Sequence, residues 1–163
     1  MGQKQLVTRT QIAKMPGEEK THFLNASAKR VNKSLGDLVG MDRLGFHLMV
    51  LPVGAVASEF HRHLCEEECI YILEGTGMAR IGPDMFPVEA GDFIGYPAGG
   101  EAHDLRNTGS SLMTCIVVGL RLDFDVADYP EHNKRLYRYA GHSCDIVDIA
   151  AVSHPTAGNK KRP

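Results

Sequence analysis

The feature that most constrains the fold is a series of short apolar segments between residues 44 and 122, separated at regular intervals by turn-forming residues. Glycine, proline, asparagine and aspartate interrupt this stretch repeatedly, and no helical period persists for more than about two turns. Short β-branched and aromatic segments with such punctuation are typical of an all-β barrel or sandwich. We therefore predict one all-β barrel over residues 41–122. The expected strands are 44–51, 69–73, 78–81, 86–88, 93–96, 103–106 and 112–120.

The segments on either side of the predicted barrel are less regular. Residues 1–40 are mixed and polar, so we expect an N-terminal extended arm that packs on the barrel or on a partner subunit. Residues 123–163 are expected to form a C-terminal segment with a flexible tail. A short helix is predicted at Glu131–Tyr139, because Pro130 suits a first helical turn. Residues 145–152 are expected to form a closing strand or helix.

Composition and charge exclude several classes of protein. The 163 residues are 43% hydrophobic, which is enough for a buried core in one domain. With 18 basic and 20 acidic residues the chain lacks the basic face of a nucleic-acid-binding protein, and the basic cluster Lys160–Arg162 is expected to be solvated. There is no apolar run of about 18 residues, so we expect no membrane span. The N-terminus is not followed by an apolar region, so we also expect no signal peptide. We predict a cytoplasmic protein whose four cysteines are free thiols.

Four side chains stand out as candidate metal ligands, namely His61, His63, Glu68 and His103. Side chains alternate along a strand, so His61 and His63 point the same way, whereas Glu68 needs a bend between 63 and 68 to join them. A His-x-His pair alone is commonly a surface feature. The added carboxylate, the following turn residues and the distant His103 favour one divalent transition metal: zinc, manganese, iron, nickel or cobalt.

These residues lie within two spaced motifs that resemble the two motifs of the cupin superfamily. The first is Gly54-(x6)-His61-x-His63-(x4)-Glu68-(x6)-Gly75, and the second is Gly91-(x5)-Pro97-x-Gly99-(x3)-His103-(x3)-Asn107. Two gaps, one in each motif, are one residue longer than in the simplest form of the pattern, and both insertions fall in predicted loops. The resemblance covers about residues 44–120. It implies a double-stranded β-helix, or jelly-roll, barrel whose metal ligands are His61, His63, Glu68 and His103.

The resemblance does not select one activity, because similar chains include decarboxylases, dioxygenases, sugar isomerases and proteins that only bind ligands. We expect a metal-dependent enzyme acting on a small polar molecule, an organic acid or a sugar derivative. The alternatives are a non-catalytic metal-anchored binding or sensor protein and a structural dimerisation block. A homodimer is expected in each case, since a short antiparallel barrel has edges to cover.

Other residues of the predicted barrel receive a structural interpretation. Tyr71 and Tyr96 are expected to pack in the wall, and Cys115 in the core. We expect the apolar side chains of Phe46 and Leu48, and not that of His47, to face the cavity. No free carboxylate inside the barrel is evident from the alternation of side chains, which weakens a mechanism based on proton transfer.

Overall fold

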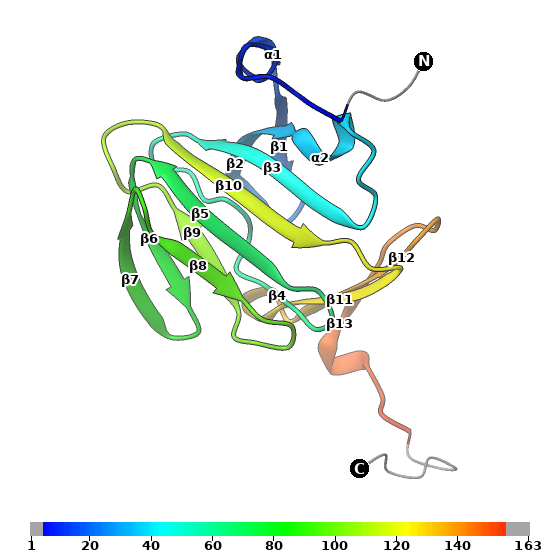
Figure 1. The fold of residues 1–163 in the computed structure, drawn as a ribbon. Helices are drawn as coiled ribbons and strands as arrows, with labels where there is room; N and C mark the ends of the chain where they lie inside the picture. The colour runs from blue at the N-terminus through cyan, green and yellow to red at the C-terminus, as the bar shows by residue number, and fades with distance from the viewer. Residues whose placement is uncertain (1–4, 156–163) are drawn as a thin grey trace.

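The structure, a computed structural model, describes residues 5–155 as three antiparallel sheets with two short helices near the N-terminus (Figure 1). The basic cluster Lys160–Arg162 and the end of the predicted tail lie outside these residues. Within residues 5–155, no helix has both the length and the apolar character needed to cross a membrane.

A six-stranded sheet forms one wall of the molecule, with the strand order β1–β2–β3–β10–β5–β8. Its strands are β1 (Glu18–His22), β2 (Asn25–Ser34), β3 (Leu44–Leu51), β5 (Glu68–Glu74), β8 (Phe93–Tyr96) and β10 (Met113–Leu120). Helix α1 (Arg9–Lys14) precedes β1, and helix α2 (Leu35–Leu38) connects β2 to β3. The N-terminal segment is therefore helix α1 followed by a hairpin that extends this sheet.

Two smaller sheets complete the fold. One has the order β7–β6–β9, and the other has the order β13–β12–β11–β4. The first contains β6 (Thr76–Ile81), β7 (Asp84–Glu89) and β9 (His103–Arg106). The second contains β4 (Arg62–His63), β11 (Phe124–Tyr129), β12 (Lys134–Tyr139) and β13 (Asp145–Asp148), with the single turns η1 (Pro130–His132) and η2 (Ile149–Ala151).

The core lies between the six-stranded sheet and the β7–β6–β9 sheet. Cys115 of β10 is opposite Met49 of β3 and Ile72 of β5, and all three side chains are buried. They pack in one cluster with Ala79 and Leu105 from the facing sheet. Complete burial of an aliphatic side chain is worth roughly 1.5–3 kcal/mol, so this row of contacts holds the two sheets together.

Two expectations from the sequence are wrong. The predicted helix at Glu131–Tyr139 is limited to the turn η1, and the remainder is strand β12, because its backbone groups pair with those of both β11 and β13. His47 faces inward, with Met49, and the alternate residues Phe46 and Leu48 form the outer face of β3. The side chains on both faces of β3 are largely apolar, so the sequence of this strand does not indicate which face is buried.

The predicted turn at Gly75 is confirmed. Its φ of +92° is a conformation that glycine adopts freely, and a Cβ atom there would lie 2.9 Å from the Leu112 carbonyl oxygen. This glycine turns the chain from β5 into β6, two strands that lie in different sheets.

Candidate metal centre

The backbone brings His61 and His103 together although 41 residues separate them in the sequence. The His61 N–H donates to the His103 carbonyl oxygen at 3.2 Å, and the His103 N–H donates to the His61 carbonyl oxygen at 2.7 Å. Their imidazole rings lie 4.9 Å apart between centroids. His63, two residues after His61, ends strand β4 and pairs with Ala127 of β11.

The Nδ1 atom of each of these three histidines lies beside a fixed acceptor. His61 Nδ1 is 2.7 Å from the Glu59 carbonyl oxygen, and His103 Nδ1 is 3.2 Å from the Glu101 carbonyl oxygen. His63 Nδ1 is 2.6 Å from the Asp125 carboxylate. Since a carbonyl or carboxylate oxygen only accepts, each Nδ1 must carry hydrogen, and the neutral rings present a bare Nε2 lone pair.

The Nε2 atoms then need a partner that supplies positive charge. His61 Nε2 and His63 Nε2 lie 3.1 Å apart, and His103 Nε2 is buried with no hydrogen-bond partner. Two bare lone pairs at 3.1 Å repel each other unless a proton or a cation lies between them. Nitrogen ligands about 2.1 Å from one metal and at right angles would be about 3.0 Å apart, so the His61–His63 spacing fits a metal ion. A metal-binding histidine usually donates its other ring N–H to a carboxylate or a backbone carbonyl oxygen, as these three rings do.

Glu68 enters the same region from the start of β5. Residues 64–67 lie between β4 and β5 and belong to neither strand, which provides the bend that the sequence requires. Glu68 is opposite Tyr96 of β8, and it lines one cavity together with His61 and His63. The Tyr96 ring stacks on the His103 ring with centroids 3.5 Å apart, as expected of a wall residue.

Burial favours the neutral forms of two of the imidazoles. Burial, followed by the charges of neighbouring histidines, lowers the pKa of His61 to about 3, and burial lowers that of His103 to about 4. Burial alone would lower the pKa of His63 as well, but the hydrogen bond and charge of Asp125 outweigh it and raise that pKa. Burial raises the pKa of the Glu68 carboxyl group.

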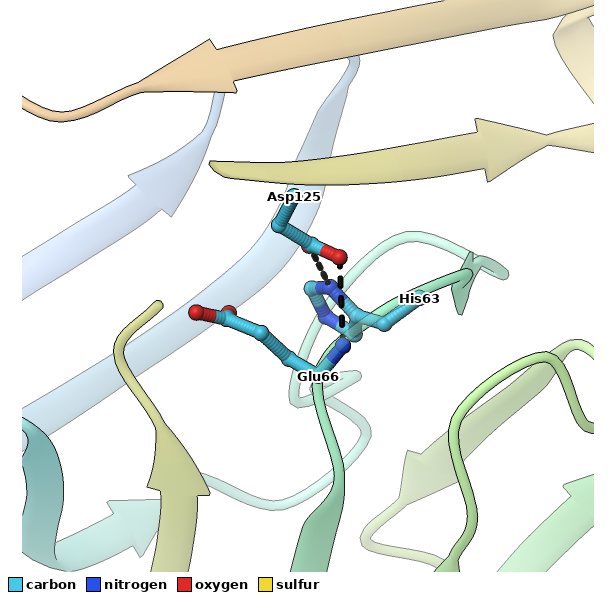
Figure 2. A group of neighbouring side chains, drawn as sticks. All are labelled: His63, Glu66 and Asp125. Carbon is cyan, nitrogen blue, oxygen red and sulfur yellow. Dashed lines mark hydrogen bonds and ion pairs between the residues drawn. The ribbon is translucent and has the colours of Figure 1, made fainter. Parts of the chain in front are cut away.

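A second group of potential ligands surrounds Asp125, a residue that the sequence analysis did not single out. Among residues 5–155, His63, Glu66 and Asp125 are the one set of three whose ligand atoms lie within 4.8 Å of one another, so this group could hold a metal ion. The four residues predicted from the sequence do not meet that criterion together. Figure 2 shows Asp125 bonded both to the His63 ring and to the backbone nitrogen of Glu66.

The oxygens of this acidic group already accept hydrogen bonds from the protein. Asp125 Oδ1 accepts the N–H groups of Cys65 and Glu66 at 3.1 and 3.2 Å, and its Oδ2 is next to His63. Glu66 Oε1 accepts the N–H of Leu122 at 2.6 Å and pairs with Arg138. These bonds indicate that Asp125 and Glu66 hold the bend and orient His63. Alternation does not reveal Asp125 in the sequence, because residues 124–129 place their two aspartates three positions apart and do not alternate apolar with polar.

An open cavity of about 400 Å³ lies against His61, His63 and Glu68. Its wall includes two further imidazoles, those of His22 and His47, and the phenol of Tyr129. Burial lowers the pKa of His22 and of His47, so both rings are neutral at pH 7. The Leu24 N–H donates to His22 Nδ1 at 3.2 Å, which leaves the hydrogen of a neutral His22 on Nε2. The cavity therefore adds proton donors and acceptors to the candidate metal ligands.

Sequence and structure comparisons identify proteins that are similar to this chain. The sequence model described as Cupin domain matches residues 47–119. A crystal structure of a candidate sugar phosphate isomerase from Acidithiobacillus ferrooxidans is 45% identical and superposes with a TM-score of 0.90, covering 93% of this chain and 97% of that one. A sugar phosphate isomerase of a cupin superfamily from Silicibacter pomeroyi is 26% identical, with a TM-score of 0.75 over 85% of this chain and 89% of that one.

Two more distant matches are informative about the fold or about a part of the chain. A predicted oxalate decarboxylase from Thermotoga maritima, 24% identical with a TM-score of 0.59 over 72% of this chain and all of that one, shares the fold. An uncharacterised protein of Methanocaldococcus jannaschii is 36% identical over 61 residues. That match spans 37% of this chain and 47% of the relative, which is about half of the relative's length.

Proposed function

Because this chain belongs to the cupin superfamily, we propose that it is a metal-dependent enzyme that isomerises a small sugar derivative. The observation that carries the proposal is the fixed set of three imidazoles, each with Nδ1 held by an acceptor and Nε2 left for a ligand. The names of the two most similar structures above support an isomerase.

We assign the metal to His61, His63, Glu68 and His103, with zinc, manganese, iron, nickel or cobalt as the candidates. His61, His63 and Glu68 line one cavity, and His103 is the backbone partner of His61. The buried, unpartnered Nε2 of His103 supports this choice. The oxygens of Asp125 argue against the acidic group as the primary site, because they already accept three hydrogen bonds.

The chemistry follows from the neutral rings in the cavity wall. A bound divalent ion would polarise an oxygen of the substrate. His47, whose Nδ1 lies 3.0 Å from the Ser34 hydroxyl, is the proposed acid–base group, since burial keeps it neutral and able to accept a proton. His22 donates from Nε2 to a substrate oxygen. A proton leaves one carbon and returns to its neighbour while the proton of the adjacent hydroxyl passes to the carbonyl oxygen, so the isomerisation balances and needs no oxidant.

Variants of two nearby glutamates test the metal assignment. Glu68→Gln is expected to reduce metal content after purification without chelators, while Glu66→Gln is expected to keep about one ion per chain, both measured by elemental analysis. The opposite result would move the site to the group around Asp125.

His47→Gln tests the acid–base assignment. The variant should keep the metal and lose about 100-fold or more in reaction rate.

The same preparation distinguishes the enzyme from a non-catalytic binding protein. Metal-loaded protein is incubated with small aldoses, ketoses and their phosphates, and products are followed by NMR in heavy water. Formation of an isomer supports the proposal. Tight retention of a compound without conversion would favour the binding or sensor protein.

We also propose that the protein is a homodimer, formed through the outer face of the six-stranded sheet. Phe93, Tyr71 and Leu73 are 67%, 43% and 45% exposed, and an apolar groove lies beside Phe93. Light scattering should give a dimer mass for the protein and a monomer mass for Phe93→Glu.

A cytoplasmic location is inferred from the four unpaired cysteines, which suit a reducing compartment.

A further inference from the structure

Two basic side chains are placed directly opposite each other on the hairpin of β1 and β2. Lys20 of β1 and Arg30 of β2 are cross-strand partners, and both line the cavity beside His61, His63 and Glu68. Like charges opposite each other on one face of a sheet destabilise it. An anion bound in the cavity between the two cations would remove this cost.

Of these two cations, Arg30 is better placed to bind an anion. No carboxylate oxygen of residues 5–155 lies within 4.0 Å of its guanidinium group, although seven other side chains of Lys or Arg make such pairs with acids. Its one hydrogen bond is from Nη1 to the Ala57 carbonyl oxygen. A guanidinium group has five N–H donors in a planar fork, so most of them remain available to a ligand.

A polar acceptor lies next to this pair on the same face of β2. Asn32 is only 9% exposed, its side-chain oxygen is buried without a hydrogen-bond partner, and the residue lines the same cavity. Such a group is uncommon in a folded protein and calls for a donor from outside the chain. A hydroxyl group of a ligand would provide one.

We infer that Arg30 and Lys20 form a subsite for a phosphoryl group, with Asn32 accepting a hydroxyl of the same ligand. This inference deepens the proposed function, on which it rests, by naming the substrate class as a phosphorylated polyhydroxy compound. The lining cations Lys20, Arg30 and Arg121 outnumber the lining carboxylate Glu68. Arg121 is paired with Asp37 at 2.5 Å and Lys20 with Glu18 at 3.1 Å, so Arg30 is the cation of the three without a carboxylate within 4.0 Å among residues 5–155. A phosphate monoester carries about −1.5 to −2 charges at pH 7, which suits two facing cations and the bidentate geometry of arginine.

Calorimetric titration of the purified protein with inorganic phosphate tests the subsite. Arg30→Gln is expected to weaken phosphate binding by about 10- to 100-fold, which is the loss expected for a hydrogen bond to a charged group. Lys20→Gln is a second, independent variant with an expected loss of about 3-fold to 10-fold. Lys29→Gln is the matched control, because Lys29 is an exposed lysine on the same strand, adjacent to Arg30. Thermal unfolding establishes that each variant is folded.

The outcomes separate the subsite from the enzyme proposal. Equal phosphate affinity in Arg30→Gln and Lys29→Gln, or acetate binding as tightly as phosphate, would overturn the inference. Glu68→Gln should lose metal. Compared with the unmodified protein after metal has been removed from both, it should bind phosphate at least as tightly, since it removes a negative charge near Arg30. Phosphate binding that depends on Arg30 in a protein with no isomerase activity would refute the proposed reaction and leave the subsite standing.

Discussion

Asparagine in place of Asp125 is expected to weaken metal binding by about 10- to 100-fold, although Asp125 is not among the proposed ligands. The Asp125 carboxylate lies 2.6 Å from His63 Nδ1 and is almost fully buried. Hydrogen bonds to charged groups contribute about 1.5–3 kcal/mol, and each 1.4 kcal/mol is a factor of ten in a dissociation constant. Substitution of the group that accepts a hydrogen bond from a metal-bound histidine typically reduces metal affinity by about the same factor.

The loss arises from the tautomer of His63. In Asp125→Asn, the amide oxygen can still accept the N–H groups of Cys65 and Glu66, which places the amide nitrogen beside His63 Nδ1. Two N–H groups cannot face each other, so the ring moves its hydrogen to Nε2, the atom proposed to bind the metal. Metal binding must then reverse this change.

Competition with a chromophoric zinc chelator at pH 7 measures the effect. Asp123→Asn is the control, because Asp123 is exposed and lies two residues away. Thermal unfolding without metal checks that both variants are folded. Affinity within about twofold of the control would refute the tautomer reasoning. Complete loss of binding would instead make Asp125 a ligand.

Two other perturbations follow from the same geometry. The stabilisation of the protein by metal should grow from pH 5.5 to pH 8. Because the pKa of His63 is raised, its charged form stabilises the metal-free protein below about pH 6.5, and this contribution is lost as pH rises through the raised value. Metal binding requires the neutral ring, so it gains as the charged form disappears. A difference in melting temperature with and without zinc that stays constant over this range would contradict the expectation. Asn107→Ala should lower the free energy of unfolding by about 3 kcal/mol in urea titrations, because the fully buried Asn107 amide bonds the carbonyl oxygens of Leu51 and Ser111 and the N–H of Gly109. Ser111→Ala, which leaves these backbone groups intact, should change it by less than about 0.5 kcal/mol.

The sequence predicted the strands of the barrel well because turn residues mark their ends. Gly75 shows the reason, since its positive φ is a local requirement that one residue type meets. The segment after Tyr129 shows the opposite case. Pro130 gives a correct local signal for the turn η1, but the state of residues 134–139 depends on backbone partners in β11 and β13, which local preferences do not reveal.

The site was predictable to a similar extent. His61, His63 and Glu68 were placed near one another by strand alternation and a bend, and the structure puts all three at one cavity. Their identity as metal ligands stays a prediction. Asp125 and Arg30 could not be found in this way, because each reaches the site from a strand far away in the sequence, and a single charged residue in a strand is most often solvated.

The separation of Arg30 from the imidazoles has a consequence for how such proteins could diversify. The basic pair lies on a hairpin that joins the rest of the sheet only along β3, whereas His61 and His103 belong to the segments that enclose the core. The proposed phosphoryl subsite and the proposed metal ligands are thus encoded by separate lengths of polypeptide. If the proposed function holds, grafting a hairpin of different charge onto the same scaffold would favour another class of compound while the proposed metal ligands stay unaltered.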